Sequence, residues 1–331
     1  MRGILTLMAL ILSSAMASAQ PAPQTACDSL AGLWLLPRAE GMAQVYAIDD
    51  APAAIAACDA ARAQYPSEPA FALLLARALM AADPMDTRAV ALVTGAQAEL
   101  PVLGAAQLAA YYENGLAGLP ASERIARDFY ARACEGWPAP NARPGCAGLA
   151  RMMIEGRGGP ADESGGFEML QSLCSEGWAM ACTDLAQQQE LRGEASDRQV
   201  TALLARACDG GDLFGCSVLG FRYETETGAP YDIARARALY ERACDGGEML
   251  GCGNLGEVYR SGLGVAPDIA RAVELFGRAC TGNDAYACVT LGNILANGRG
   301  VPADVPRAIA AFDQACLLGD PEACDQADIL R

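Results

Sequence analysis

The chain has 331 residues, with 40 Asp and Glu residues against 24 basic residues, so its formal net charge at pH 7 is −16. Phosphate backbones and anionic lipid surfaces repel such an acidic chain, which argues against binding to nucleic acid or to a membrane surface. The sequence contains neither Lys nor His, so every basic residue is Arg. This composition excludes Ser-Lys and His-assisted hydrolase mechanisms, and also zinc sites that need His ligands.

The first 19 residues have the pattern of a secretory signal peptide. Arg2 precedes an apolar run over residues 4–12, and a small-residue stretch then ends at Ala19 in an Ala-x-Ala cleavage pattern. A membrane anchor would need about 20 apolar residues, which is longer than this run. We therefore expect a cleaved signal peptide over residues 1–19, delivery to the bacterial periplasm or outside the cell, no membrane insertion after cleavage, and a disordered lead over residues 20–26.

Residues 27–103 predict a helical start to the folded chain. Apolar segments at 54–58 and 73–79 flank residues 65–69, which contain two prolines. Apolar helical spacing interrupted by proline is typical of helices joined by a turn.

Evenly spaced cysteine pairs mark an internal repeat farther along the chain. Four cysteines recur every 36 residues, and each has a second cysteine eight residues later. A fixed period of this length is the signature of a repeat architecture. The first members of these pairs are Cys208, Cys244, Cys280 and Cys316.

One period predicts two short amphipathic helices joined by a glycine loop. In the first helix, Leu255, Gly256 and Tyr259 lie on one face, while Asp268 stands where the second helix needs an N-cap. Glycine inside a helix costs up to about 1 kcal/mol relative to alanine, so a glycine in constant register indicates close helix packing. The recurring glycines are Gly220, Gly256 and Gly292, and the recurring aromatic residues Tyr240, Phe276 and Phe312 are predicted to be core.

The cysteine spacing predicts local disulfides. Two cysteines eight residues apart on one helix would be separated by about 12 Å, beyond the limit of about 7 Å between bridged Cα atoms, so each pair must bracket a turn. No Cys-x-x-Cys or Cys/His cluster is present, so we expect neither a metal nor another cofactor. The expected pairs are Cys174–Cys182, Cys208–Cys216, Cys244–Cys252, Cys280–Cys288 and Cys316–Cys324, with the looser Cys134–Cys146 and Cys27–Cys58 assigned partly by elimination.

The Leu-Gly-x-x-Tyr pattern at 255–259, the glycine loop at 262–265 and the helix that begins after Asp268 resemble the Sel1-like repeats, relatives of the tetratricopeptide repeat. The regular cysteine pairs are similar to those of the cysteine-rich Hcp family of secreted bacterial proteins. This resemblance implies an all-α, right-handed α/α solenoid of disulfide-linked helical pairs. It further implies a divergent tetratricopeptide-like start over residues 27–103 and Sel1-like repeats over 104–331, with a terminal capping helix at 320–331.

The resemblance implies two classes of function. One is a non-catalytic scaffold that binds a protein or peptide partner, in the cell envelope or outside the cell, in a concave groove. The other is a penicillin-binding protein or weak β-lactamase, as attributed to Hcp-type proteins. Since Lys and His are absent, we expect no enzymatic activity of the known β-lactamase types. Binding of a muropeptide or another cell-wall fragment remains an alternative.

Helical phase predicts which side chains would line such a groove. With Leu255 and Tyr259 facing inward, other positions of the first helices stay exposed, and asparagine there suits a peptide backbone because its amide offers donors and an acceptor. Each of these residues taken alone could equally be an ordinary solvent-facing side chain. The predicted groove residues are Phe221, Thr225, Asn254, Glu257, Ser261, Thr290, Asn293 and Asn297.

Overall fold

The computed structural model describes residues 24–31, 48 and 50–331. The expected signal peptide lies outside the described residues. Of the expected lead, residues 20–23 also lie outside them, and Ala26 is already the first residue of a helix. Across the described ranges the regular elements are all helices, with no strand.

The helices follow one another along the chain with short connections. In order they are α1 (Ala26–Ala31), α2 (Ala51–Gln64), α3 (Ala70–Ala82), α4 (Arg88–Ala96), α5 (Pro101–Asn114), α6 (Glu123–Cys134), the 3-10 turn η2 (Pro140–Ala142), α7 (Arg143–Glu155), α8 (Glu163–Ser175), α9 (Ala179–Arg192), α10 (Asp197–Asp209), α11 (Leu213–Glu224), α12 (Ile233–Asp245), α13 (Met249–Ser261), α14 (Ile269–Thr281), α15 (Ala285–Asn297), α16 (Val305–Leu317) and α17 (Pro321–Leu330).

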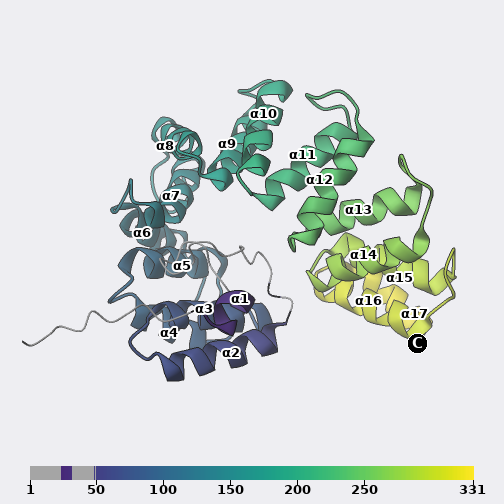
Figure 1. Cartoon of the computed structure of the whole chain (residues 1–331), viewed down its shortest axis with the longest axis horizontal. Coiled ribbons are helices and arrows are strands. Elements are labelled where there is room, and N and C mark those ends of the chain that lie inside the picture. Colours follow the sequence, from purple (N-terminus) through teal and green to yellow (C-terminus); the bar gives the residue numbers. More distant parts are fainter. Residues whose placement is uncertain (1–23, 32–47, 49) are drawn as a thin grey trace, which may run out of the picture.

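From α5 onward, consecutive helices pair into the solenoid expected from the sequence. The odd-numbered helices are the first helices of the pairs, and each packs on the even-numbered second helix that follows it. First helices of neighbouring pairs also contact one another, as α5 contacts α7 and α11 contacts α13. Figure 1 shows the chain curving from α2 to α17, with α5, α7 and α9 on the inner side of the curve and α6, α8 and α10 on the outer side. The first helices therefore form an inner layer in this part of the solenoid.

Local sequence signals explain where the helices begin and end. The carboxylates of Asp232, Asp268 and Asp304 each accept a hydrogen bond from the backbone N–H three residues later, at 2.9, 2.9 and 3.2 Å. These bonds satisfy donors that the first turn of a helix leaves free. At the other end, Gly262 and Gly298 adopt φ of 71° and 63°, a left-handed conformation that ends α13 and α15.

The glycines in the middle of the first helices stand where an aromatic ring of the second helix approaches. A Cβ atom on Gly220 would lie 2.7 Å from the ring of Tyr240, and one on Gly292 would lie 2.7 Å from the ring of Phe312. Both rings are buried. The recurring glycines and the recurring aromatic residues are therefore two halves of one packing contact, which is repeated in successive pairs.

Seven disulfides join the helices, and they are the pairs expected from the eight-residue spacing and, for the two looser pairs, partly by elimination. Their Cα–Cα distances lie between 4.5 and 4.9 Å. From Cys134 onward, each disulfide links the end of a second helix to the next first helix and so fixes one pair to its successor. The bonds are Cys27–Cys58, Cys134–Cys146, Cys174–Cys182, Cys208–Cys216, Cys244–Cys252, Cys280–Cys288 and Cys316–Cys324.

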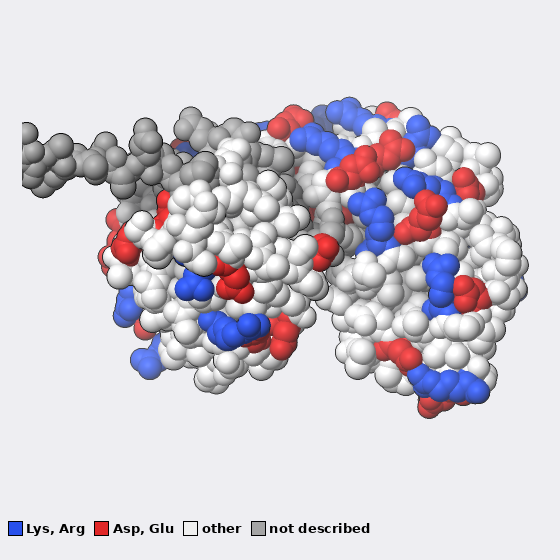
Figure 2. All heavy atoms as spheres, turned by 60° about the horizontal axis from the view of Figure 1, so that its bottom comes forward, with Lys and Arg blue, Asp and Glu red and all other residues white. Residues whose placement is uncertain are grey.

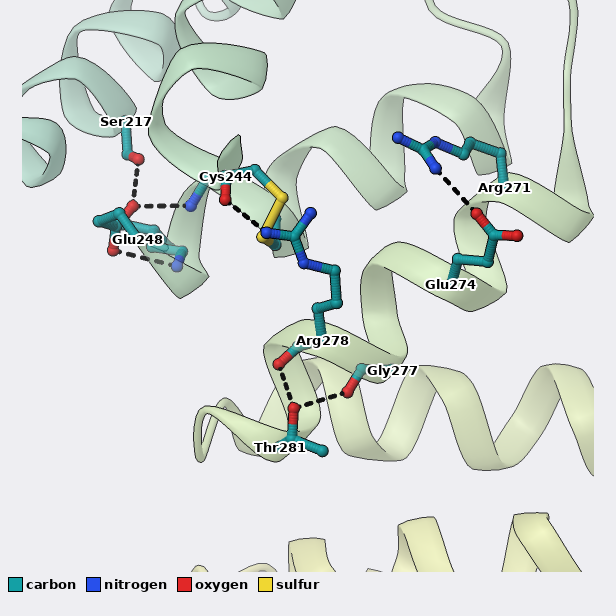
Figure 3. Close-up of a disulfide and its surroundings, with 11 residues drawn as sticks. Ser217, Cys244, Glu248, Arg271, Glu274, Gly277, Arg278 and Thr281 are labelled. Atoms are coloured by element: carbon teal, nitrogen blue, oxygen red, sulfur yellow. Dashed lines mark hydrogen bonds and ion pairs between the residues drawn. A yellow bond between two sulfur atoms is a disulfide. The ribbon is translucent and has the colours of Figure 1, made fainter. Parts of the chain in front are cut away.

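A recurring arginine adds a second connection between repeats, which the sequence analysis did not anticipate. Each of these arginines lies two residues before the first cysteine of a pair and donates to the carbonyl oxygen of the corresponding cysteine one repeat earlier. Figure 3 shows this contact for Arg278 and Cys244, beside the Cys244–Cys252 disulfide. The bonds are Arg206 to Cys174 at 3.0 Å, Arg242 to Cys208 at 2.8 Å and Arg278 to Cys244 at 2.6 Å.

The two ends of the chain close the core in different ways. At the N-terminal end, α2 to α5 enclose a separate apolar cluster that includes Phe71, Leu74 and Leu79. The expected boundary between residues 103 and 104 lies inside α5, which contributes Leu103 and Leu108 to that cluster. At the C-terminal end, α17 covers the core cluster of the last repeats through Ala323 and Ala327.

Candidate binding groove

Exposed apolar side chains recur along the first helices. They occupy the position two residues before the second cysteine in the pairs that end at Cys216, Cys252 and Cys288, where the disulfide fixes the start of the first helix. Phe214 and Leu250 are each 37% exposed and Tyr286 is 62% exposed. Met180 holds the same position in α9 and is half-buried. We call the set Met180, Phe214, Leu250 and Tyr286 the apolar ladder. Exposed aromatic and aliphatic side chains repeated in one register are typical of a recognition surface.

Three of the predicted groove residues line one pocket at the C-terminal end of the solenoid. Thr290, Asn293 and Asn297 project from one face of α15, together with Tyr286 of the apolar ladder. This Arg–Asn pocket has a volume of about 410 Å³. Its lining residues are Arg260, Ile269, Tyr286, Thr290, Asn293, Ile294, Asn297 and Arg299.

The Arg–Asn pocket carries positive charge although the whole chain is acidic. Arg260 is held by Glu257 through hydrogen bonds of 2.9 and 2.7 Å. Arg299 is exposed and has no ion pair with any residue that the structure describes. The side-chain amide of Asn297 donates to the backbone carbonyl of Asn293 at 2.8 Å. The side-chain amide of Asn293 is exposed on the same face, and both amides offer hydrogen-bonding groups to a ligand.

The other predicted groove residues line neither this pocket nor the second one described below. Ser261 donates to Glu257, and the Thr225 hydroxyl donates to the backbone carbonyl of Phe221 at 2.8 Å, so both make local contacts. Asn254 is half-buried on α13, whereas Phe221 is 52% exposed on α11. The structure therefore brings together the α15 members of the predicted set and leaves the α11 and α13 members apart from them.

A second pocket, which the sequence analysis missed, lies between α7, α9 and α11. We call it the acidic pocket, and its volume is about 310 Å³. Asp184 and Gln187 follow the second cysteine of their pair by two and five residues, which is the register of Thr290 and Asn293 in α15. Counting from Cys182 would have found them. The lining residues are Pro144, Ala147, Gly148, Arg151, Trp178, Met180, Thr183, Asp184, Gln187, Asp212 and Phe214.

Two carboxyl groups in the acidic pocket, those of Asp184 and Asp212, have raised pKa values. Burial raises the pKa of the Asp184 carboxyl to about 6, and Arg151, whose Nε lies 3.9 Å from the Asp184 carboxylate, opposes only part of that rise. Burial also raises the pKa of Asp212, against the hydrogen bond that the Thr183 hydroxyl donates to it at 2.5 Å. The Asp212 carboxylate therefore already accepts a hydrogen bond within the protein, whereas Asp184 accepts none from the residues that the structure describes.

The face of the molecule seen in Figure 2 shows no extended patch of one charge. On the face seen in Figure 2, arginine side chains lie beside acidic side chains, and uncharged areas separate these groups. The two pockets combine a few charged or amide groups with apolar walls, which is the composition of a site that binds and orients a ligand.

Tandem helical pairs whose first helices repeat the same surface positions define an α-helical repeat scaffold. The Sel1 repeat model matches residues 102–136, 144–178, 214–248, 250–284 and 285–320, which together make up more than half of the chain. The chain therefore belongs to the Sel1 repeat family, whose members are typically scaffolds for protein interactions. The match omits residues 179–213, where α9 and α10 nevertheless pack as an antiparallel pair.

Two of the solved structures to which the chain is similar, the first two below, share this fold over most of its length. A Sel1 repeat protein from Oxalobacter formigenes is 18% identical, with a TM-score of 0.53 over 74% of this chain and 96% of that protein. The protective antigen c5321 of uropathogenic Escherichia coli is 20% identical, with a TM-score of 0.50 over 83% of this chain and 58% of that antigen. The cysteine-rich protein B of Helicobacter pylori is 26% identical over 40% of this chain and 97% of its own length, with a TM-score of 0.33. No curated protein matches the chain by sequence.

The covalent chemistry indicates the compartment. All of the cysteines are paired, and disulfides persist in oxidising environments outside the cytoplasm. Among the described residues, no helix combines the length and the apolar character needed to cross a membrane.

Proposed function

We propose that the face formed by the first helices of the solenoid binds an extended segment of a protein partner without catalysing a reaction on it. The observation that carries this proposal is the Arg–Asn pocket, where Thr290, Asn293 and Asn297 share one helix face with the exposed ring of Tyr286. An extended peptide needs hydrogen-bonding partners for its backbone and apolar contacts for its side chains. The amides of α15 and the apolar ladder offer these two kinds of contact.

The repeat geometry supports an extended ligand over a compact one. The apolar ladder places one apolar side chain on each of four successive first helices, exposed on α11, α13 and α15 and half-buried on α9. Solenoids present such repeated positions along a continuous surface. A segment that follows the first helices would meet the same kind of contact once in every repeat.

The partner belongs in the compartment where the disulfides form. Seven disulfides and the signal-peptide pattern of residues 1–19 support a location in the bacterial periplasm or outside the cell. A protein of the cell envelope, or one outside the cell, is therefore the expected partner.

Affinity capture from envelope extract under non-reducing conditions tests the proposal. The wild-type chain is compared with a Thr290→Ala/Asn293→Ala variant, and binding of each captured protein is then measured by titration with the purified components. We expect the variant to bind at least about tenfold more weakly, since two hydrogen-bonding side chains are lost. Its melting temperature should match that of the wild type.

The matched control is an Arg271→Ala/Glu274→Ala variant, which removes an exposed ion pair from the second helix α14. This control should bind the partner like the wild type. Equal binding by the Thr290→Ala/Asn293→Ala variant would reject the groove. Specific binding of a muropeptide without any protein partner would instead favour a cell-wall ligand.

A further inference from the structure

We propose that the acidic pocket between α7, α9 and α11 receives the basic side chain of an arginine or lysine from the bound segment. This inference rests on the proposed function, because it names a residue type that the groove would select. It concerns a different pocket from the one that carries the proposed function, so the two can fail separately.

The walls of the acidic pocket suit the apolar stem of a long basic side chain. Trp178 is buried at the pocket, and Phe214 and Met180 of the apolar ladder are at its edge. Arginine and lysine bury their methylene groups against such surfaces while the charged end seeks a polar partner. An aromatic ring such as that of Phe214 also attracts a cation placed over its face.

Asp184 supplies the partner for the charged end. Its side chain is about one-fifth exposed and lines the pocket, so a ligand can reach it. Within the described part of the chain, its one ion pair is with Arg151 at 3.9 Å, which is longer than a hydrogen bond. Arg151 also lies 3.8 Å from Glu113 and is therefore shared between two acids. The Asp184 carboxylate keeps its hydrogen-bonding capacity for an incoming cation.

The charges around Asp184 favour a cation over an anion. Three other acids act on Asp184 from neighbouring elements: Asp212 lies just before α11, Glu155 is on α7 and Glu113 is on α5. Each makes the electrostatic potential at Asp184 more negative. Arg151 on α7 opposes them, and Arg157 is engaged by Glu113, Glu123 and Glu155 at 2.8, 2.9 and 3.4 Å. Acids therefore outnumber the arginines that face them, and a cationic side chain would relieve the repulsion.

The acid is specific to this repeat. The positions equivalent to Asp184 in the next three first helices hold Val218, Asn254 and Thr290, which are uncharged. Among these four helices, the one with a carboxylate at this position is also the one where a pocket with two aromatic side chains in its walls lies beside it. The register thus fixes one basic residue at the α9 end of a bound segment and leaves the other repeats for uncharged contacts.

Fragment binding to the full chain tests the proposal without a known partner. The probe is n-butylguanidinium, which has the chemistry of an arginine side chain, and the reporter is the ¹⁹F signal of 5-fluorotryptophan at position 178. We expect a saturable shift of this signal with n-butylguanidinium and none with butanol or butyrate. An Asp184→Asn variant, which keeps the size of the side chain, should weaken binding by about tenfold or more.

Controls separate this inference from the proposed function. Thr290→Ala/Asn293→Ala should leave fragment binding unchanged, and the melting temperature of Asp184→Asn should show that the variant is folded. An unshifted signal in the wild type, or equal binding by Asp184→Asn, would overturn the basic-side-chain site even if partner capture succeeds. Saturable, Asp184-dependent binding supports the site even if the Arg–Asn pocket captures nothing.

Discussion

The guanidinium of Arg278, on α14, donates a hydrogen bond of 2.6 Å to the backbone carbonyl oxygen of Cys244, at the end of α12. The last carbonyl groups of a helix have no partner within it and carry partial negative charge, so a cationic donor is favourable there. Cys244 is also bonded to Cys252 of α13. Cys244 thus connects α12 both to α13, through the disulfide, and to α14, through the hydrogen bond from Arg278.

Replacing Arg278 with alanine should destabilise the C-terminal repeats by about 1.5–3 kcal/mol, the usual contribution of a hydrogen bond to a charged group. The measurement is the melting temperature by circular dichroism. Arg271→Ala on the same helix is the matched control, because its pair with Glu274 is exposed and should be worth less than about 0.5 kcal/mol. Equal effects of the two variants would contradict a structural role for the carbonyl contact.

Gly292→Ala should destabilise the chain, because the new Cβ would lie 2.7 Å from the buried ring of Phe312. Overpacking of this kind costs about 1–3 kcal/mol. Gly277→Ala on α14 is the comparison, since its added Cβ would have no atom within 4 Å beyond its chain neighbours and the nearby backbone of its own helix. That change should stabilise by about 0.5–1 kcal/mol through helix propensity. Thermal unfolding of both variants checks the opposite signs, and a stabilising Gly292→Ala would show that the close approach is not required.

The repeated elements were predictable because their signals are local. The helices, their Asp caps and the glycine loops depend on residues a few positions apart, and the cysteine register supplied the disulfide pairs. The contact of Gly292 with Phe312 was predictable in part, since a glycine and an aromatic residue recur at these two positions every 36 residues. In each case the sequence itself contains both partners, at fixed spacing.

The features that were missed depend on partners that a sequence does not reveal. The acceptor of Arg278 is a backbone carbonyl, which no residue type signals. Arg222 looks like a surface arginine of an amphipathic helix, yet it is buried and donates to Glu190, Thr201 and Asp197 on the two preceding helices. Pockets depend on the curvature of the solenoid, so residues in the same register contribute to the groove in one repeat and not in another.

Removing one internal disulfide should cost more stability than removing the last one. A Cys244→Ala/Cys252→Ala variant loses a loop constraint of about 2–3 kcal/mol in the chain-entropy model, and it also loosens the contact between α12 and α13. Loss of Cys316–Cys324 would affect only the junction with the terminal helix α17, because each unit of a solenoid contacts only its neighbours. Urea unfolding curves of the two double variants provide the comparison, and equal losses would contradict it.

The acidic pocket predicts a pH dependence of stability whose sign follows from Asp184. Its pKa in the folded chain, about 6, lies above the ordinary value of 3.8, so the folded state holds the proton more tightly than the unfolded state. This group therefore lowers stability as pH rises from about 4 to about 6, by up to about 3 kcal/mol. Asp184→Asn has no titrating carboxyl at this position. The stability of the variant relative to the wild type should therefore increase as pH rises through this window and stay higher above it. Melting temperatures of both chains between about pH 4 and pH 8 measure the difference, and a difference that does not change with pH would show that the Asp184 carboxylate is as well solvated in the folded chain as in the unfolded one.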